Sequence, residues 1–141
     1  MYTDEDTWIR FARLTQIYKE LGEYIREAVR QNAEDKIPVM RPLFLQYEND
    51  VGSYTQDYEY MFGDDLLVAP VTEKNVTTWE VYLPGPEGWV WLWDDFELPL
   101  QGPTTVTVEA EMGETPVFYK FGSIWTELFR SINQRFSITK N

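Results

Sequence analysis

The residues in this sequence that most invite a catalytic interpretation are two pairs of adjacent aspartates, Asp64-Asp65 and Asp94-Asp95. Enzymes that cleave glycosidic bonds with retention use two carboxyl groups about 5–5.5 Å apart, one as nucleophile and one as acid and base. Neighbouring residues on a strand point to opposite faces, and neighbouring acids in a turn usually face water. We therefore expect both pairs to be solvated turn acids, and we assign no catalytic residue.

The composition excludes several other kinds of site. The chain has 141 residues without histidine or cysteine, which excludes a Ser-His-Asp triad, an imidazole-ligated metal and a thiolate-ligated metal. Residues 48–53, Glu-Asn-Asp-Val-Gly-Ser, lack the ligand spacing and the closing glutamate of a calcium loop. We therefore expect no metal site.

Three tryptophans, Trp89, Trp91 and Trp93, alternate along one predicted strand and so project from one of its faces. Such a row could stack on sugar rings and form a carbohydrate-binding platform. Aromatic residues at this spacing more often pack inside a β-sandwich. We expect them to be core residues and keep the sugar platform as the alternative.

The charge of the chain limits its partners. With 24 acidic and 12 basic residues the formal net charge is −12, which repels nucleic-acid phosphates and anionic lipid, so we expect neither nucleic acid nor membrane as a partner. No apolar run approaches the roughly 18 residues of a transmembrane helix, and the first six residues lack the basic character of a signal peptide. We expect a soluble, cytoplasmic chain.

The first third of the chain has the pattern of one long amphipathic helix. From a cap at Asp6 or Thr7, apolar residues recur every three or four positions, which predicts a helix to about Asn32. Gly22 predicts a kink or a break, because glycine costs a helix interior about 1 kcal/mol relative to alanine. The apolar positions are Trp8, Phe11, Leu14, Tyr18, Leu21, Ile25 and Ala28. A helix with this stripe must be covered.

Two uncharged runs, residues 42–45 and 66–70, have the character of strands that are covered on both faces. The first predicts a strand from Val39 to Leu45, although Pro42 within it cannot donate to a strand ladder. From Val71 onward, short alternating segments predict an antiparallel sandwich or roll. These segments are residues 78–83, 89–93, 105–110 and 116–121.

The end of the chain predicts one further helix. Ser123 can cap a helix that runs to about Arg135. The residues expected on its buried side are Ile124, Leu128, Phe129 and Ile132.

Four motifs occur in the order, and at about the separations, of a known family. They are Arg41-Pro42-Leu43-Phe44; Tyr60-Met61-Phe62-Gly63 followed by Leu66-Leu67-Val68-Ala69-Pro70-Val71; Val81-Tyr82-Leu83-Pro84; and Trp89-Val90-Trp91-Leu92-Trp93. Together they resemble the C-terminal third of a family 31 glycoside hydrolase, over roughly residues 6 to 135. The ending Thr115-Pro116-Val117-Phe118-Tyr119-Lys120, with Trp125 and Phe129, most resembles the sulfoquinovosidase branch of that family.

The resemblance implies an α+β fold in three parts. Residues 1–62 would be the end of a (β/α)8 catalytic barrel, with the long N-terminal amphipathic helix and the last barrel strand. Residues 63–123 would be an antiparallel β-sandwich-like domain, and residues 124–141 a terminal helix and tail. Because active sites of such barrels lie at the C-terminal ends of the strands, Gln46, Tyr47 and Glu48 would lie at the rim of the substrate pocket.

The resemblance also implies an activity for a longer parent protein. The parent would be a retaining α-glycosidase that acts on α-glycosides or sulfoquinovosides, with two catalytic aspartates on earlier barrel strands and with no metal or organic cofactor. The motifs that carry those aspartates are absent from this sequence, so we expect the isolated chain to be inactive.

Two alternatives from other classes remain open. One is a freestanding carbohydrate-binding module that uses the tryptophan face. The other is a structural interaction domain, or a split-gene product that needs a partner chain with the catalytic half. Because this sequence lacks most of the strands that would cover the N-terminal helix, we expect the helix to fold back across the β-domain or to pair with a second copy.

Overall fold

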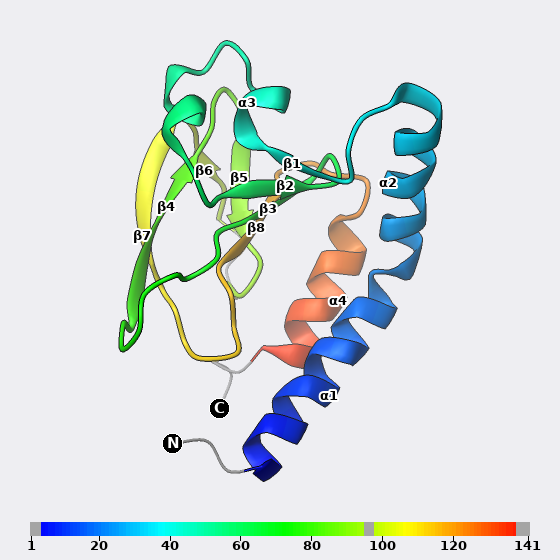
Figure 1. Ribbon diagram of the computed structural model, residues 1–141, viewed down its shortest axis with the longest axis vertical. Helices are drawn as coiled ribbons and strands as arrows, with labels where there is room; N and C mark the ends of the chain where they lie inside the picture. The colour runs from blue at the N-terminus through cyan, green and yellow to red at the C-terminus, as the bar shows by residue number, and fades with distance from the viewer. Residues whose placement is uncertain (1–3, 95–97, 138–141) are drawn as a thin grey trace.

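The computed structural model describes residues 4–94 and 98–137, and it places a layer of helices beside two antiparallel sheets (Figure 1). Helices α1 (Asp4–Glu20) and α2 (Gly22–Asp35) form the outer side of this layer, and α4 (Thr126–Phe136) lies against α1. Within the described residues, no helix is long and apolar enough to cross a membrane.

Most strands belong to one six-stranded sheet, in which every pairing is antiparallel and the order is β1-β2-β3-β8-β5-β6. Its strands are β1 (Met40–Pro42), β2 (Tyr60–Phe62), β3 (Leu66–Val68), β5 (Gly88–Trp91), β6 (Leu100–Gln101) and β8 (Val117–Lys120). A second sheet consists of β4 (Thr78–Leu83) and β7 (Thr104–Glu109), with Val81 opposite Val106. The predicted antiparallel β-domain is therefore confirmed.

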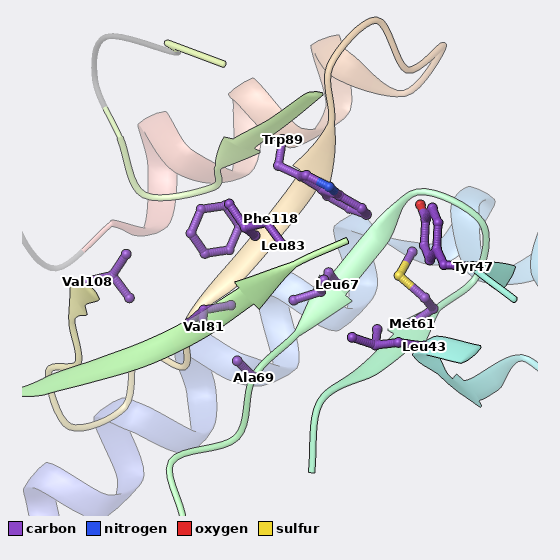
Figure 2. Close-up of a cluster of buried hydrophobic side chains, with 10 residues drawn as sticks. All are labelled: Leu43, Tyr47, Met61, Leu67, Ala69, Val81, Leu83, Trp89, Val108 and Phe118. Atoms are coloured by element: carbon purple, nitrogen blue, oxygen red, sulfur yellow. The ribbon is translucent and has the colours of Figure 1, made fainter. Parts of the chain in front are cut away.

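The six-stranded sheet is the middle layer of three. Successive residues of a strand point to opposite faces; thus Leu67 and Phe118 pack toward β4 and β7, whereas Leu66 and Tyr119 pack toward the helices. The cluster between the sheets is shown in Figure 2 and comprises Leu43, Tyr47, Met61, Leu67, Ala69, Val81, Leu83, Trp89, Val108 and Phe118. The core thus consists of two apolar layers separated by one sheet.

The predicted N-terminal helix is present and is divided at Leu21, which confirms the break expected beside Gly22. The helical hydrogen bonds continue across the break, because the Leu21 amide donates to Ile17 and the Leu21 carbonyl accepts from Ile25. α2 ends at Asp35, where the following residue, Lys36, takes a left-handed conformation with φ 60°.

The predicted strand from Val39 to Leu45 is wrong in its second half. β1 ends at Pro42, and residues Leu43–Gln46 form the short helix α3. Pro42 has no N–H to donate to a ladder, and its φ of −62° and ψ of 155° suit a residue just before a helix. The turn places Leu43 in the core with 0% exposure. β1 itself is antiparallel to β2 and is exposed on one face, so it is not the doubly covered strand that we expected.

The remaining predicted elements agree closely with the structure. β4 has the predicted bounds, whereas β5 ends at Trp91, two residues earlier than expected. Phe129 and Ile132 are buried on α4 as predicted, but Ile124 is 89% exposed because it lies in the turn before the helix. Residues 138–141 of the predicted tail lie outside the described residues.

Candidate functional site

The three residues expected at a pocket rim lie at the end of α3 and in the turn that follows. An open hollow of about 320 Å³ is lined there by residues 45–50 together with Gly85 and Pro86. Gln46 Nε2 donates a hydrogen bond to the Asp64 carbonyl at 2.8 Å, and Tyr47 is buried with its ring edge-on to Trp89 at 6.0 Å (Figure 2). Glu48 is exposed. Of the three, only Glu48 extends freely into solvent.

Asp50 fixes this segment to the β-domain. Its Oδ1 accepts hydrogen bonds from the Tyr82 hydroxyl at 2.5 Å and from the Gly52 amide at 3.0 Å, and its Oδ2 accepts from the Gly85 amide at 2.8 Å. Burial and the hydrogen bond to Asp50 raise the pKa of Tyr82 to about 12. From the sequence we considered Asp50 only as part of a calcium-like loop, and we missed this anchoring role.

A buried carboxyl group, that of Glu59, joins the two sheets just below this segment. Glu59 lies immediately before β2, and its Oε1 accepts a hydrogen bond from the Tyr82 amide of β4 at 2.8 Å. The side chain is 8% exposed, and Oε2 has no partner within residues 4–94 and 98–137. Burial raises the pKa of Glu59 to about 7, although the Tyr82 amide opposes the shift.

The Asp64-Asp65 pair lies in a turn as expected, and the Asp64 side chain is 47% exposed, but both carboxyl groups have hydrogen-bond partners in other elements and are not simply solvated acids. Asp64 accepts from Arg41 through Oδ1 and from Gln31 through Oδ2, both at 2.8 Å. Asp65 accepts from the Ser123 hydroxyl at 3.0 Å, and burial raises its pKa. The two acids connect the β2–β3 turn to α2, β1 and the segment before α4. The residues next to Asp64 and Asp65 in the sequence could not reveal hydrogen-bond partners that are distant along the chain.

The same turn is capped by a tyrosine from α2. The Tyr24 hydroxyl donates to the Phe62 carbonyl and accepts from the amides of Asp65 at 3.0 Å and Leu66 at 3.2 Å. Gly63 has φ +67°, and a Cβ there would lie 2.4 Å from the Tyr24 hydroxyl oxygen. Burial raises the pKa of Tyr24, so the hydroxyl remains protonated and can serve as donor and acceptor.

Of the second aspartate pair, only Asp94 lies within the described residues. Asp94 accepts a hydrogen bond at its carbonyl oxygen from Asn133 Nδ2 at 2.7 Å. Asp95 lies outside the described residues.

The three tryptophans do not form an exposed row. Trp89 is 0% exposed, donates to the Pro84 carbonyl at 2.8 Å and belongs to the cluster between the sheets. Trp93 is 6% exposed, donates to the Thr115 carbonyl at 3.0 Å and belongs to the cluster beneath the helices. Trp91 is partly buried and contacts both clusters. These positions favour core packing over a sugar platform.

Asp50 and Glu59 each accept hydrogen bonds that join neighbouring segments of the chain. Asp50 has hydrogen-bond donors on both carboxylate oxygens, and the buried Glu59 faces the protein interior. In the part of the chain that the structure describes, no group of three or more acidic side chains is placed to hold a metal ion. The geometry thus fixes the loop against the β-domain.

Comparisons with known proteins agree with the motifs. The glycosyl hydrolase family 31 C-terminal domain matches residues 36–125. The chain is 46% identical over 129 residues to the sulfoquinovosidase of Escherichia coli strain K12. This alignment covers 92% of this chain and 18% of that protein. It is 40% identical over 129 residues to the sulfoquinovosidase of Agrobacterium fabrum, covering 92% of this chain and 19% of that protein.

A solved structure shows the same arrangement. The family 31 sulfoquinovosidase from E. rectale, in complex with an aza-sugar inhibitor, aligns with a TM-score of 0.88 and 42% identity, covering 96% of this chain and 20% of that one. This chain thus spans less than one fifth of the length of the curated sulfoquinovosidases that it matches. The family identified from the motifs is confirmed, and the chain belongs to glycoside hydrolase family 31, whose C-terminal domain it contains together with two preceding helices.

Proposed function

We propose that this chain is the C-terminal part of a retaining α-glycosidase that hydrolyses α-linked sulfoquinovosides. The observation that carries the proposal is the likeness to sulfoquinovosidases along nearly the whole chain, at 46% and 40% identity over 92% of its length. Human neutral alpha-glucosidase AB is 38% identical over 72% of the chain, so the likeness to a glucosidase is both weaker and shorter.

In this proposal the catalytic aspartates lie in the portion of the glycosidase that precedes this chain, and this chain supports the pocket. Gln46, Tyr47 and Glu48 form part of the rim, with Glu48 as the exposed member. Asp50 holds the segment against β4 through Tyr82, and Gln46 holds it against the β2–β3 turn. A rigid rim favours catalysis because small displacements of positioning groups lower the rate strongly.

The test requires the complete enzyme, which contains this chain together with the catalytic portion. Both parts are taken from the same genome. We expect it to hydrolyse 4-nitrophenyl α-sulfoquinovoside with a kcat/KM at least about 100-fold above that for 4-nitrophenyl α-glucoside, because a site built to bind a charged group rejects an analogue without it. The isolated chain should hydrolyse neither substrate above the uncatalysed rate.

Two results would overturn this proposal. One is a preference of the complete enzyme for the glucoside, which would favour an ordinary α-glucosidase. The other is turnover by the isolated chain that an Asp64→Asn substitution abolishes, since this would place a catalytic carboxyl group in the β2–β3 turn.

A further inference from the structure

We propose that the outer edge of β7 is an interaction surface that pairs with the β7 edge of a second copy of this chain. β7 belongs to the two-stranded sheet and lies on the side of the molecule opposite α1 and α2 (Figure 1). The N-terminal helices, which we expected to fold back or to pair with a second copy, pack on the β-domain through Ile17 and Leu21. The pairing through β7 is independent of the glycosidase activity proposed above.

The register of the β4–β7 pair shows which backbone groups of β7 point outward. The Ala110 amide donates to the Thr77 carbonyl at 2.9 Å, so these two residues form a hydrogen-bonded pair. Hydrogen-bonded and non-hydrogen-bonded pairs alternate along an antiparallel ladder, so the backbone groups of Thr105, Thr107 and Glu109 point away from β4. Within residues 4–94 and 98–137, these outward amides and carbonyls have no hydrogen-bond partner. They are therefore available to another strand.

The other strand edges of the two sheets are less able to accept a strand. On the far side of β4, the segment before β2 covers the edge at Tyr82, whose amide donates to the buried carboxyl group of Glu59. At the ends of the six-stranded sheet, β1 has three residues and includes Pro42, and β6 has two residues. Short edge strands and prolines prevent edge pairing. β7 has six residues and contains neither proline nor lysine.

The side chains of β7 favour its continuation into a wider sheet. Thr105, Thr107 and Glu109 are exposed, whereas Val106 and Val108 pack against the cluster between the sheets. Threonine and valine are enriched in strands because their branched side chains suit a pleated, half-buried surface. Val106 is only partly buried, so a strand added beside β7 would cover it further.

A second copy fits this edge in one particular register. A two-fold axis at Thr107 sets Thr107 opposite itself and Thr105 opposite Glu109 of the other copy. Each facing pair would exchange two backbone hydrogen bonds, and Val106 would lie beside Val108 of the other copy on the inner face. The Cα atoms of the two Glu109 residues are then about 15 Å apart, so like charges do not face each other.

The arrangement closes at two copies. The joined sheet has the order β4-β7-β7-β4, and both of its outer edges are β4 strands that the segment before β2 covers at Tyr82. An interface that uses the same surface of both copies is closed, whereas a molecule with two different free edges could add copies without end. The difference between the β4 and β7 edges therefore favours a dimer over a filament.

The dimer is expected to be weak and to depend on salt. A stable interface buries about 800 Å² on each partner, and a six-residue edge offers less, so the dimer should form at high protein concentration. Each copy has a net charge of −12, and the repulsion between two copies is screened at high ionic strength. The association constant should rise at least about threefold when NaCl is raised from 0.05 M to 0.5 M.

Crosslinking of single-cysteine variants tests the register, because the chain has no cysteine of its own. In the proposed dimer the Cα atoms of the two Thr107 residues lie about 5.5 Å apart, which a disulfide can span. Thr107→Cys should therefore form a covalent dimer at 0.5 M NaCl under mild oxidation. Thr105→Cys is the matched control and should give at least about tenfold less, because its Cα atoms would be about 15 Å apart. An equimolar mixture of Thr105→Cys and Glu109→Cys should crosslink as fully as Thr107→Cys.

Charged substitutions at Thr107 provide a second measurement by sedimentation equilibrium at 0.15 M NaCl. Thr107→Lys and Thr107→Glu should each lower the association constant at least about threefold, because like charges would face each other across the axis. A mixture of the two variants should associate at least about threefold more tightly than either variant alone. Thr78→Lys is the control, since Thr78 is an exposed threonine on β4, and it should associate like the wild type.

Three results would overturn the proposal. One is a monomer at every protein concentration up to about 1 mM, and another is equal crosslinking of Thr105→Cys and Thr107→Cys. The third is a dimer that both charged variants form as tightly as the wild type, which would assign the association to another surface, such as the exposed apolar side chains of α1.

Discussion

Replacing Glu59 by glutamine should make the fold more stable at neutral and mildly alkaline pH, with little gain near pH 5. The Glu59 carboxyl group is 8% exposed, and only one of its oxygens has a hydrogen-bond partner within the described residues. Ionisation therefore places a charge in the layer between the sheets, where it is poorly solvated. Glutamine has nearly the same shape, and its carbonyl oxygen can still accept the hydrogen bond from the Tyr82 amide.

The magnitude follows from the shift of the pKa of Glu59 from 4.5 to about 7 on folding. A raised folded-state pKa means that the native state binds the proton more tightly than the unfolded state. The stabilisation by this proton is fully present below the unfolded pKa and disappears as the pH rises through the folded pKa. Between pH 5 and pH 8 the contribution of Glu59 to the free energy of unfolding should therefore fall by about 2.5 kcal/mol.

Urea unfolding of the wild type and of Glu59→Gln at pH 5, 6, 7 and 8 measures this contribution. It is the difference between the two free energies of unfolding, in which the contributions of the other titrating groups cancel. Glu80→Gln is the control, because Glu80 is exposed on β4; it should change the free energy of unfolding by less than about 0.5 kcal/mol at every pH. A difference between wild type and Glu59→Gln that does not vary with pH would refute the reasoning.

Five further substitutions test the packing and the polar anchors by urea unfolding. Trp89→Ala should lower the free energy of unfolding by about 3–5 kcal/mol, because Trp89 is fully buried in the cluster between the sheets. Arg13→Ala should cost about 3 kcal/mol by leaving the buried Glu114 without this ion pair, and Arg13→Lys should cost less. Asp64→Ala should cost about 1–3 kcal/mol, because it leaves the buried Arg41, which is 4% exposed, without its ion pair, while the 47% exposure of Asp64 limits the cost. Asp57→Ala is the control and should have little effect, because Asp57 is exposed.

Elements governed by local sequence were predicted well. The break beside Gly22 and the bounds of β4 follow from glycine propensity and from two-residue alternation, which act within a few residues. The family motifs added the order of the elements. The division of residues 1–62 from residues 63–123 stays a prediction.

Features that depend on distant contacts were predicted poorly. Leu43 begins a helix rather than continuing a strand because the core accepts its side chain at that point, which the uncharged run could not reveal. Ser123 and Asp65 are 58 residues apart in the sequence, and Gln31 and Asp64 are 33 apart. An acidic turn looks solvated until the residues that fold against it are known.

These distant contacts also connect the helices to the proposed rim. Gln31 of α2 donates a hydrogen bond to the Asp64 carboxylate at 2.8 Å. The backbone carbonyl oxygen of Asp64 accepts a hydrogen bond from Gln46, also at 2.8 Å. Asp64 is thus held from the helical layer on one side and holds the rim segment on the other.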